Sequence, residues 1–253
     1  MSLQNFAGAL ATKKHCKEGV ALFYKRDRFK LISVENKVLQ ESLENDEVNK
    51  ELLERVSRNQ SFKSTVTQRG SCVLLAVLQS IEDPRRHLVV ANTHLYWHPR
   101  APNIRLVQMG IVLNLVKAKV DSMLSTDGAI VTPIICGDLN SNPTSGVCDL
   151  IRDGTLPSNH ADWYAGGITN YHGGDWTLSH DMSFINSCGS LSYTTYVTAF
   201  TGCLDYIFIN PQQINVKQVV PHPPHNLVTM HTALPCVTSP SDHIAQVVDL
   251  EWA

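Results

Sequence analysis

Three short apolar runs rich in β-branched residues limit most strongly how this chain can fold. They lie at residues 72–81, 87–95 and 130–136, and polar residues follow each of them closely. Runs of this length and composition are typical of strands that are buried on both faces of a sheet. Such a sheet needs helices to cover it, and residues 103–120 place apolar side chains on most sides of a helix. The pattern therefore predicts a mixed α/β domain.

The rest of the chain adds strands more often than helices, without a regular βαβ alternation. Shorter strands are expected at 19–24, 29–34, 204–210, 214–220 and 243–252, and one solvated amphipathic helix at 45–60. Residues 158–177 and 221–240 are rich in turn-forming residues and are expected to be loops. Because no repeat or linker divides the sequence, residues 1–253 are expected to form one domain.

Composition excludes several classes of function. The 21 Lys and Arg against 23 Asp and Glu give a formal net charge of -2, so no overall positive field draws the chain to nucleic acid or anionic lipid. No apolar run approaches the ~20 residues of a membrane span. The seven Cys are spaced singly, which favours reduced thiols and argues against a zinc site. The start of the chain lacks a secretory signal and resembles a transit peptide only weakly, so we expect no targeting segment.

The sharpest local pattern for chemistry is the pair Asp138 and Asn140, which follows the strand expected at 130–136. Residues two apart in an extended chain point the same way, so both side chains would project from the end of the sheet. An aspartate can accept a proton or bind a cation, while an asparagine amide can donate to a phosphate oxygen. The alternative is an Asx turn after the strand, and the motif alone leaves the two interpretations evenly balanced.

Histidines and another acid stand at the ends of other expected strands. Asp205 begins an apolar strand, where a buried carboxylate needs a partner, and His243 at the head of the last strand is the natural candidate. His94 closes the strand at 87–95 and Trp97 follows it, although each alone is more often a packing residue. Because sites in α/β folds gather at strand ends, the combination favours a catalytic site. Motifs for a serine nucleophile, a P-loop or a dinucleotide are absent.

The same residues carry a family resemblance. The chain resembles the endonuclease/exonuclease/phosphatase superfamily of Mg²⁺-dependent phosphodiesterases, through segments in the order Asn92-Thr93-His94-Leu95, Gly137-Asp138-Leu139-Asn140-Ser141, Leu204-Asp205-Tyr206-Ile207-Phe208 and Ser241-Asp242-His243. The resemblance implies a deoxyribonuclease I-like fold, which is a four-layer α/β sandwich with two sheets back to back, helices outside and the site at one edge of the sheets. It also implies a divalent cation, Mg²⁺ or else Mn²⁺.

Roles for the site residues follow from the resemblance. Asp138 would orient or deprotonate the attacking water, and Asn140 would hold the scissile phosphate. Asp205 would pair with His243, whose imidazole contacts that phosphate.

The resemblance also implies a metal ligand set and a partner for the first histidine. Asp242 would help to hold Mg²⁺ together with Asp138 and Asn140. His94 would stabilise the phosphate or protonate the leaving oxygen, and a hydrogen bond from His94 to Glu18 would orient the ring.

The substrate that the resemblance implies is adenylate-rich RNA. Segments such as Tyr96-Trp97-His98-Pro99-Arg100 are similar to the branch that cleaves 2′,5′-linked oligoadenylate, releases AMP and is mitochondrial. Phe200 matches the position at which relatives stack an aromatic ring on the base, and Trp97 is a further candidate contact. The alternatives are a 3′,5′ poly(A) deadenylase of the carbon catabolite repressor or nocturnin type, a cytoplasmic location, and an inactive fragment that only binds RNA. No membrane is expected, and the sequence does not allow a protein partner to be inferred.

At the N-terminus the sequence departs from the family pattern. Members begin with a strand that carries an Asn and a second strand that ends in a metal-binding Glu, and neither occurs in this sequence. We therefore expect a domain whose first strands are missing. Such a domain would expose strand edges and apolar surface, and would bind its metal weakly.

Overall fold

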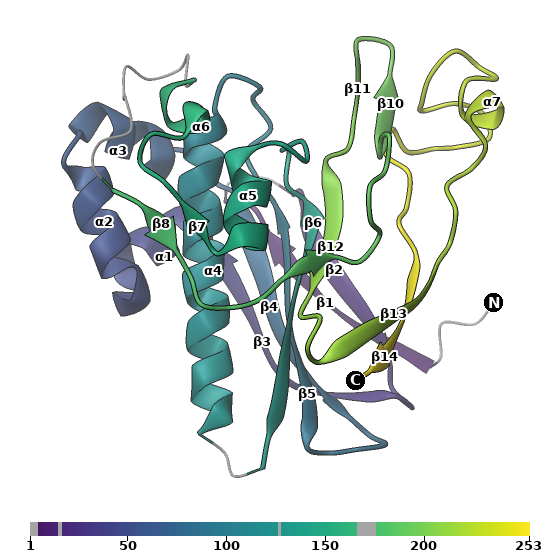
Figure 1. The fold of residues 1–253 in the computed structure, drawn as a ribbon, viewed down its shortest axis with the longest axis horizontal. Coiled ribbons are helices and arrows are strands. Elements are labelled where there is room, and N and C mark those ends of the chain that lie inside the picture. Colours follow the sequence, from purple (N-terminus) through teal and green to yellow (C-terminus); the bar gives the residue numbers. More distant parts are fainter. Residues whose placement is uncertain (1–4, 15–16, 126–127, 166–175) are drawn as a thin grey trace.

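A mixed six-stranded sheet forms the centre of the computed structural model, which describes residues 5–14, 17–125, 128–165 and 176–253 (Figure 1). The order across the sheet is β3 (Phe29–Val38), β4 (Cys72–Ser80), β5 (Arg86–His94), β6 (Ile130–Asp138), β12 (Asp205–Ile209) and β9 (Ile185–Asn186). β5 and β6 are parallel, and the other neighbours are antiparallel. The apolar runs of the sequence form the central strands because both faces of the sheet are covered.

Helices cover one face of this sheet (Figure 1). The longest, α4 (Pro102–Leu124), lies along the sheet, and its first half is buried on all sides. The other helices of this layer are α1 (Leu39–Asn45), α2 (Lys50–Ser57), α3 (Gln60–Thr67) and α5 (Gly146–Asp153), with a 3-10 turn, η2, at Glu47–Asn49. Because α4 has neighbours on both flanks, it needs no polar face, as its sequence indicates.

Two antiparallel strand pairs cover the other face of the sheet. They are the hairpin of β1 (Phe6–Thr12) with β2 (Gly19–Lys25), and the pair of β13 (Ile214–Val219) with β14 (Val248–Trp252), which a long connection joins. The apolar contacts between these strand pairs and the sheet involve Leu22, Leu31, Leu78, Val90, Ile134, Ile209, Ile214, Leu250 and Trp252. The described residues thus form two packed layers of strands with helices outside the larger one.

An apolar groove of about 640 Å³ lies between the two strand pairs. Phe23 of β2 and Trp252 of β14 belong to its lining, and Val90 of the central sheet reaches into it from β5. In the described chain, β2 pairs only with β1, and β14 pairs only with β13. In the described residues, each strand pair therefore has a strand edge without a neighbour.

Short elements complete the structure beyond these layers. They are β7 (Thr155–Leu156), β8 (Leu178–Ser179), β10 (Thr195–Val197), β11 (Phe200–Gly202), α6 (Ala161–Tyr164) and α7 (His225–Val228). The hairpin of β10 and β11 and the segment around α7 project beyond the end of the sheet, on the same side of the molecule (Figure 1). Among the residues that the structure describes, no helix combines the length and the apolar character that crossing a membrane requires.

Most of the expected elements are present, and the differences have local causes. β1 has no counterpart among the expected strands because Ala and Gly, which have low strand propensity, make up much of it. The expectation of one helix at 45–60 is wrong, because α1 ends at Asn45 and the side chain of Asn59 caps a new helix by accepting the N–H of Phe62. The last strand begins at Val248 rather than at residue 243.

In their described parts, the two expected loops are largely irregular, with one short helix in each. Residues 158–177 contain α6, and residues 166–175 of that stretch lie outside the described residues. Residues 221–240 contain only α7 as a regular element.

Candidate active site

Strand pairing brings three predicted site residues to the same level at one end of the central sheet. β5 and β6 run parallel, and their register places His94 opposite Asp138. β12 runs antiparallel to β6 on the other side, and its first residue, Asp205, is also opposite Asp138. Side chains that are far apart in the sequence therefore meet at the edge of the sheet.

Asp205 forms a hydrogen-bonded pair with His243. Oδ2 of Asp205 lies 2.7 Å from Nδ1 of His243. Thr194 donates its hydroxyl to the same carboxylate oxygen at 2.5 Å and accepts the backbone N–H of Asp205 at 3.1 Å. The hydrogen bond to Asp205 raises the pKa of His243, because the carboxylate stabilises the protonated ring. Nδ1 is thus held by the carboxylate, and Nε2 lies on the opposite side of the ring.

Asp138 has the properties of a proton acceptor. Burial raises the pKa of Asp138 to about 6, and the negative charge of Asp205 acts in the same direction. The N–H of Asn140, which donates to Oδ1 of Asp138 at 2.8 Å, opposes this shift. Oδ2 of Asp138 lies 3.4 Å from Nε2 of His94. A carboxylate of this kind can take a proton from a bound water near neutral pH.

A turn with unusual backbone angles aims Asp138 and Asn140. Gly137 has a φ of +126°, and a Cβ at this position would lie 2.0 Å from the carbonyl oxygen of Thr93. Asn140 has a φ of 48°, and its Nδ2 donates to the carbonyl of Leu95 at 2.9 Å. One N–H and the Oδ1 of Asn140 remain for a ligand, so the side chain can serve either a phosphate or a cation.

A lysine lies beside His94. Nζ of Lys13 is 3.3 Å from Nδ1 of His94 and 3.1 Å from Oε2 of Glu18. Burial, followed by the positive charge of Lys13, lowers the pKa of His94, whereas the charge of Glu18 opposes this shift. Lys13 contacts both side chains, and the direct hydrogen bond between Glu18 and His94 stays a prediction.

In the part of the chain that the structure describes, one group of side chains has the spacing of a metal site. Ligand atoms of Asp138, Asp205 and His243 all lie within 4.8 Å of one another. Two carboxylates in one site repel each other, and a bound cation would relieve this repulsion. Asp242, an expected metal ligand, is exposed and is not a member of this group. Its backbone carbonyl accepts the hydroxyl of Thr195 at 3.0 Å.

Two exposed aromatic rings belong to the loops near these strand ends. Phe200 is 49% exposed at the start of β11, and a Cβ on residue 202 would lie 2.7 Å from its ring. The glycine at 202 therefore provides the space for the Phe200 ring. Trp97 is 64% exposed in the turn after β5, and its ring centroid lies 5.3 Å from that of His98.

Two polar side chains of α4 hold the turn that carries Trp97. Arg105, which is buried, donates from Nη1 to the carbonyl of His98 at 2.7 Å and to that of Tyr96 at 3.2 Å. Gln108 accepts the N–H of Tyr96 at 2.8 Å. The exposed aromatic residue therefore stands on a turn that the protein interior fixes.

Lys13, Thr194 and Arg105 are neighbours of the site that the sequence motifs miss. The sequence contains a usable signal for Arg105, because a basic residue in a largely apolar helix needs a buried partner. It contains no signal for Lys13, whose contact joins segments 81 positions apart, or for Thr194, whose contact depends on how the β10–β11 hairpin folds back onto the start of β12.

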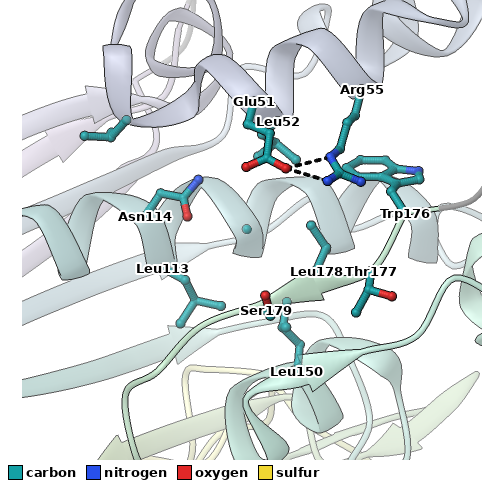
Figure 2. A pocket seen from close by; sticks show the side chains of 12 residues that line it. Glu51, Leu52, Arg55, Leu113, Asn114, Leu150, Trp176, Thr177, Leu178 and Ser179 are labelled. Carbon is teal, nitrogen blue, oxygen red and sulfur yellow. Dashed lines mark hydrogen bonds and ion pairs between the residues drawn. The ribbon is translucent and has the colours of Figure 1, made fainter.

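A separate small cavity of about 160 Å³ lies between α2, α4 and β8 (Figure 2). Arg55 pairs with Glu51 at its rim and lies 5.9 Å from the ring centroid of Trp176. None of the predicted site residues lines this cavity. The end of the central sheet is therefore the better candidate for an active site.

Comparison with known proteins agrees with the arrangement at the sheet edge. The sequence model described as "Endonuclease/Exonuclease/phosphatase family" matches residues 12–243. The chain belongs to this family. Its similarity to 2′,5′-phosphodiesterase 12 of Rattus norvegicus and of Homo sapiens is 42% identity over 246 residues, which are 97% of this chain and 39% of each relative. The CCR4-Not complex 3′-5′-exoribonuclease subunit Ccr4 of Mycosarcoma maydis is 27% identical over 90% of this chain and 35% of that protein.

Solved structures show the same fold. ANGEL2, a 2′,3′-cyclic phosphatase in complex with adenosine-2′,3′-vanadate, matches with a TM-score of 0.73 and 20% identity over 98% of this chain and 75% of that chain. The catalytic domain of human Nocturnin matches with a TM-score of 0.59 and 18% identity over 99% of this chain and 73% of that chain. The resemblance and the deoxyribonuclease I-like fold are therefore confirmed. The chain spans 39% of the length of the 2′,5′-phosphodiesterase 12 relatives.

Proposed function

We propose that this family member is a metal-dependent phosphodiesterase that hydrolyses oligoadenylate, prefers 2′,5′ linkages and releases AMP. The observation that carries the proposal is the convergence of Asp138, Asp205 and His243, with His94 3.4 Å from Asp138. The relatives with 42% identity, which are named for a 2′,5′-phosphodiesterase, favour this linkage.

The geometry supports a division of roles among the site residues. Asp138 orients a water and takes its proton as the water oxygen bonds to phosphorus. The bond between phosphorus and the ribose oxygen of the leaving nucleotide breaks, and that oxygen takes a proton from solvent water. His243, held by Asp205 through Nδ1, presents Nε2 to the phosphate, and His94 and Asn140 contact other phosphate oxygens.

The residues at the site fit a hard divalent cation. Carboxylate and amide oxygens of Asp138, Asp205 and Asn140 are the donor types that Mg²⁺ prefers, and the remaining positions around such an ion are usually filled by water. When bound, the cation would neutralise charge on the scissile phosphate. We propose Mg²⁺, or else Mn²⁺, with Asp138 and Asn140 as ligands and Asp242 as a further ligand that reaches the ion from its exposed position.

The exposed rings of Phe200 and Trp97 are the proposed base contacts. Stacking of a base on an aromatic ring contributes roughly 1 to 3 kcal/mol and works for any base, so these rings would add affinity for an oligonucleotide. The proposed substrate is 2′,5′-oligoadenylate or adenylate-rich RNA, and the proposed compartment is the mitochondrion, with the cytoplasm as the alternative. Fractionation of cells that express the tagged protein tests the compartment.

We also propose that residues 1–253 are a single catalytic domain that lacks its first strands. The support is the groove between β2 and β14, which apolar side chains line and where two strand edges pair with no further strand in the described chain. A dye that fluoresces on apolar surfaces should bind there, and Phe23→Glu should abolish the signal. A chain that binds no dye and whose β2 amides exchange as slowly as those of β4 would contradict this proposal.

The deciding experiment measures AMP release from 2′,5′-linked and 3′,5′-linked oligoadenylate by the purified chain, with Mg²⁺ and with EDTA. Asp205→Ala serves as the inactive variant, and Asp121→Ala, whose side chain pairs with Lys117 on the surface of α4, is the matched control. Release that requires Mg²⁺ and disappears only in Asp205→Ala is the expected result.

Other outcomes separate the alternatives. Faster release from the 3′,5′ linkage would favour a poly(A) deadenylase, to which the similarity with Ccr4 also points. A folded chain that binds oligoadenylate without turnover would refute the enzymatic proposal and favour a fragment that only binds RNA.

A further inference from the structure

Lys13 is a charged group that contacts two predicted site residues, although no sequence motif explains its placement there. It follows β1, and its side chain is only 16% exposed. Its backbone N–H donates to the carbonyl of Glu18 at 2.9 Å, so the residue is fixed to the end of the β1–β2 hairpin. The side chain extends from this hairpin to the end of β5, where Nζ lies 3.3 Å from Nδ1 of His94. A lysine this well covered needs partners, and Glu18 and His94 supply them.

This contact determines which nitrogen of His94 carries a proton. A lysine ammonium group is only a donor, so the hydrogen bond requires a lone pair on Nδ1 of His94. In the neutral ring, the hydrogen must then be on Nε2. Nε2 is the nitrogen that faces the catalytic side, 3.4 Å from Oδ2 of Asp138.

We propose that Lys13 is a positioning residue that holds His94 in the Nε2–H tautomer and aims this N–H into the site. Glu18 acts one step further away, because its carboxylate, 3.1 Å from Nζ, directs the ammonium group toward the ring. The catalytic consequence is that His94 donates a hydrogen bond to a phosphate oxygen and does not supply the proton for the leaving oxygen. This consequence rests on the proposed function.

The tautomer can be measured without any turnover. In a ¹⁵N-histidine-labelled chain, two-bond correlations between ring nitrogens and carbon-bound protons distinguish a protonated from an unprotonated nitrogen, and His94→Gln identifies the signals of His94. The expected result is a protonated Nε2 and an unprotonated Nδ1 in the wild-type chain. Lys13→Met should change this to a mixture or to the Nδ1–H form, whereas Lys13→Arg keeps a donor and should restore the wild-type pattern.

Lys14→Met is the matched control. Lys14 is adjacent in the sequence, but its Nζ pairs with Glu41 at 2.7 Å in a more exposed position. Its removal should leave the His94 signals unchanged. A wild-type ring with the proton on Nδ1, or an unchanged pattern in folded Lys13→Met, would overturn the proposal. If Lys13→Met does not fold, the wild-type spectrum and Lys13→Arg still decide it.

Kinetics adds a second readout if AMP release is detected. Lys13→Met should lower kcat on the order of 10- to 100-fold, as the loss of an orienting group usually does, with KM within about twofold of the wild-type value. A change confined to KM would contradict a positioning role. Absence of turnover in the wild-type chain would refute the proposed function. The role of Lys13 could still be tested, because the tautomer of His94 is measured in the resting protein.

Discussion

Replacement of Thr194 by valine tests whether Asp205 depends on its buried support. Thr194 has no solvent exposure, and its hydroxyl makes several contacts at once. It donates to Oδ2 of Asp205 at 2.5 Å, and it accepts the backbone N–H groups of Leu204 at 2.9 Å and of Asp205 at 3.1 Å. Valine has nearly the same shape, so Thr194→Val removes these bonds and leaves the packing nearly intact.

The expected cost in the free energy of unfolding follows from these bonds. A hydrogen bond to a charged group contributes about 1.5 to 3 kcal/mol, and a buried N–H left without a partner costs about 1 to 3 kcal/mol. The carboxylate of Asp205 is 23% exposed, so water can replace part of the lost donor. We therefore expect Thr194→Val to lower the free energy of unfolding by about 3 kcal/mol.

Thr195→Val is the matched control for this prediction. Thr195 is also buried, but its hydroxyl donates only to the backbone carbonyl of Asp242, at 3.0 Å. Loss of one neutral bond should cost about 1 kcal/mol. Urea unfolding of the wild-type chain and both variants, compared at the same pH and with equal m-values, measures the difference. Equal destabilisation by the two variants would refute the prediction that the bonds of Thr194 to the carboxylate and to two backbone amides contribute more stability than the single bond of Thr195.

The remaining predictions concern the end of β6 and the carboxylate of Asp138 there. Gly137→Ala should destabilise the chain by at least about 2 kcal/mol, because the backbone angle is strained for alanine and the new Cβ meets the carbonyl of Thr93. Gly189→Ala is the control, because Gly189 has a φ of +67° but nothing lies within 4 Å of an added Cβ, so this variant should lose less stability. Equal decreases in Tm for the two variants would contradict the clash with Thr93. Since the pKa of Asp138 is raised to about 6, the carboxylate is protonated below this pH and its proton must leave before Mg²⁺ binds. Calorimetry should therefore show about fourfold weaker Mg²⁺ binding at pH 5.5 than at pH 7.5, and Asp138→Asn should bind weakly with no such dependence.

The central strands and the long helix could be predicted because their patterns are local. β4, β5 and β6 are apolar runs that only a sheet covered on both faces can bury, and α4 is apolar on sides that neighbouring helices cover. β1 carries no comparable pattern. Its strand conformation comes from pairing with β2, from Phe6 opposite Lys25 to Thr12 opposite Gly19, which a residue-by-residue reading cannot foresee.

The residues of the candidate site also differ in whether the sequence alone can predict them. Asp138, Asp205 and His94 could be proposed from the sequence because each ends or begins a recognisable strand, and the strand register then places them opposite one another. Asp242 lies outside the regular strands, although β10 contacts its backbone carbonyl through the hydroxyl of Thr195 and the N–H of Tyr196. Its side chain is exposed, and its role as a metal ligand stays a prediction.

The supporting residues explain how such a site is held at an otherwise open sheet edge. Thr194 reaches Asp205 from the segment before β10, and Arg105 reaches the turn after β5 from α4. Lys13 reaches His94 from the second layer of strands. Each strand end is thus held by a side chain from another element, so the positions of the reacting groups depend on how the elements pack. A change that separates the β1–β2 hairpin from the central sheet should therefore disturb His94 first, because Lys13 is the support that this hairpin supplies.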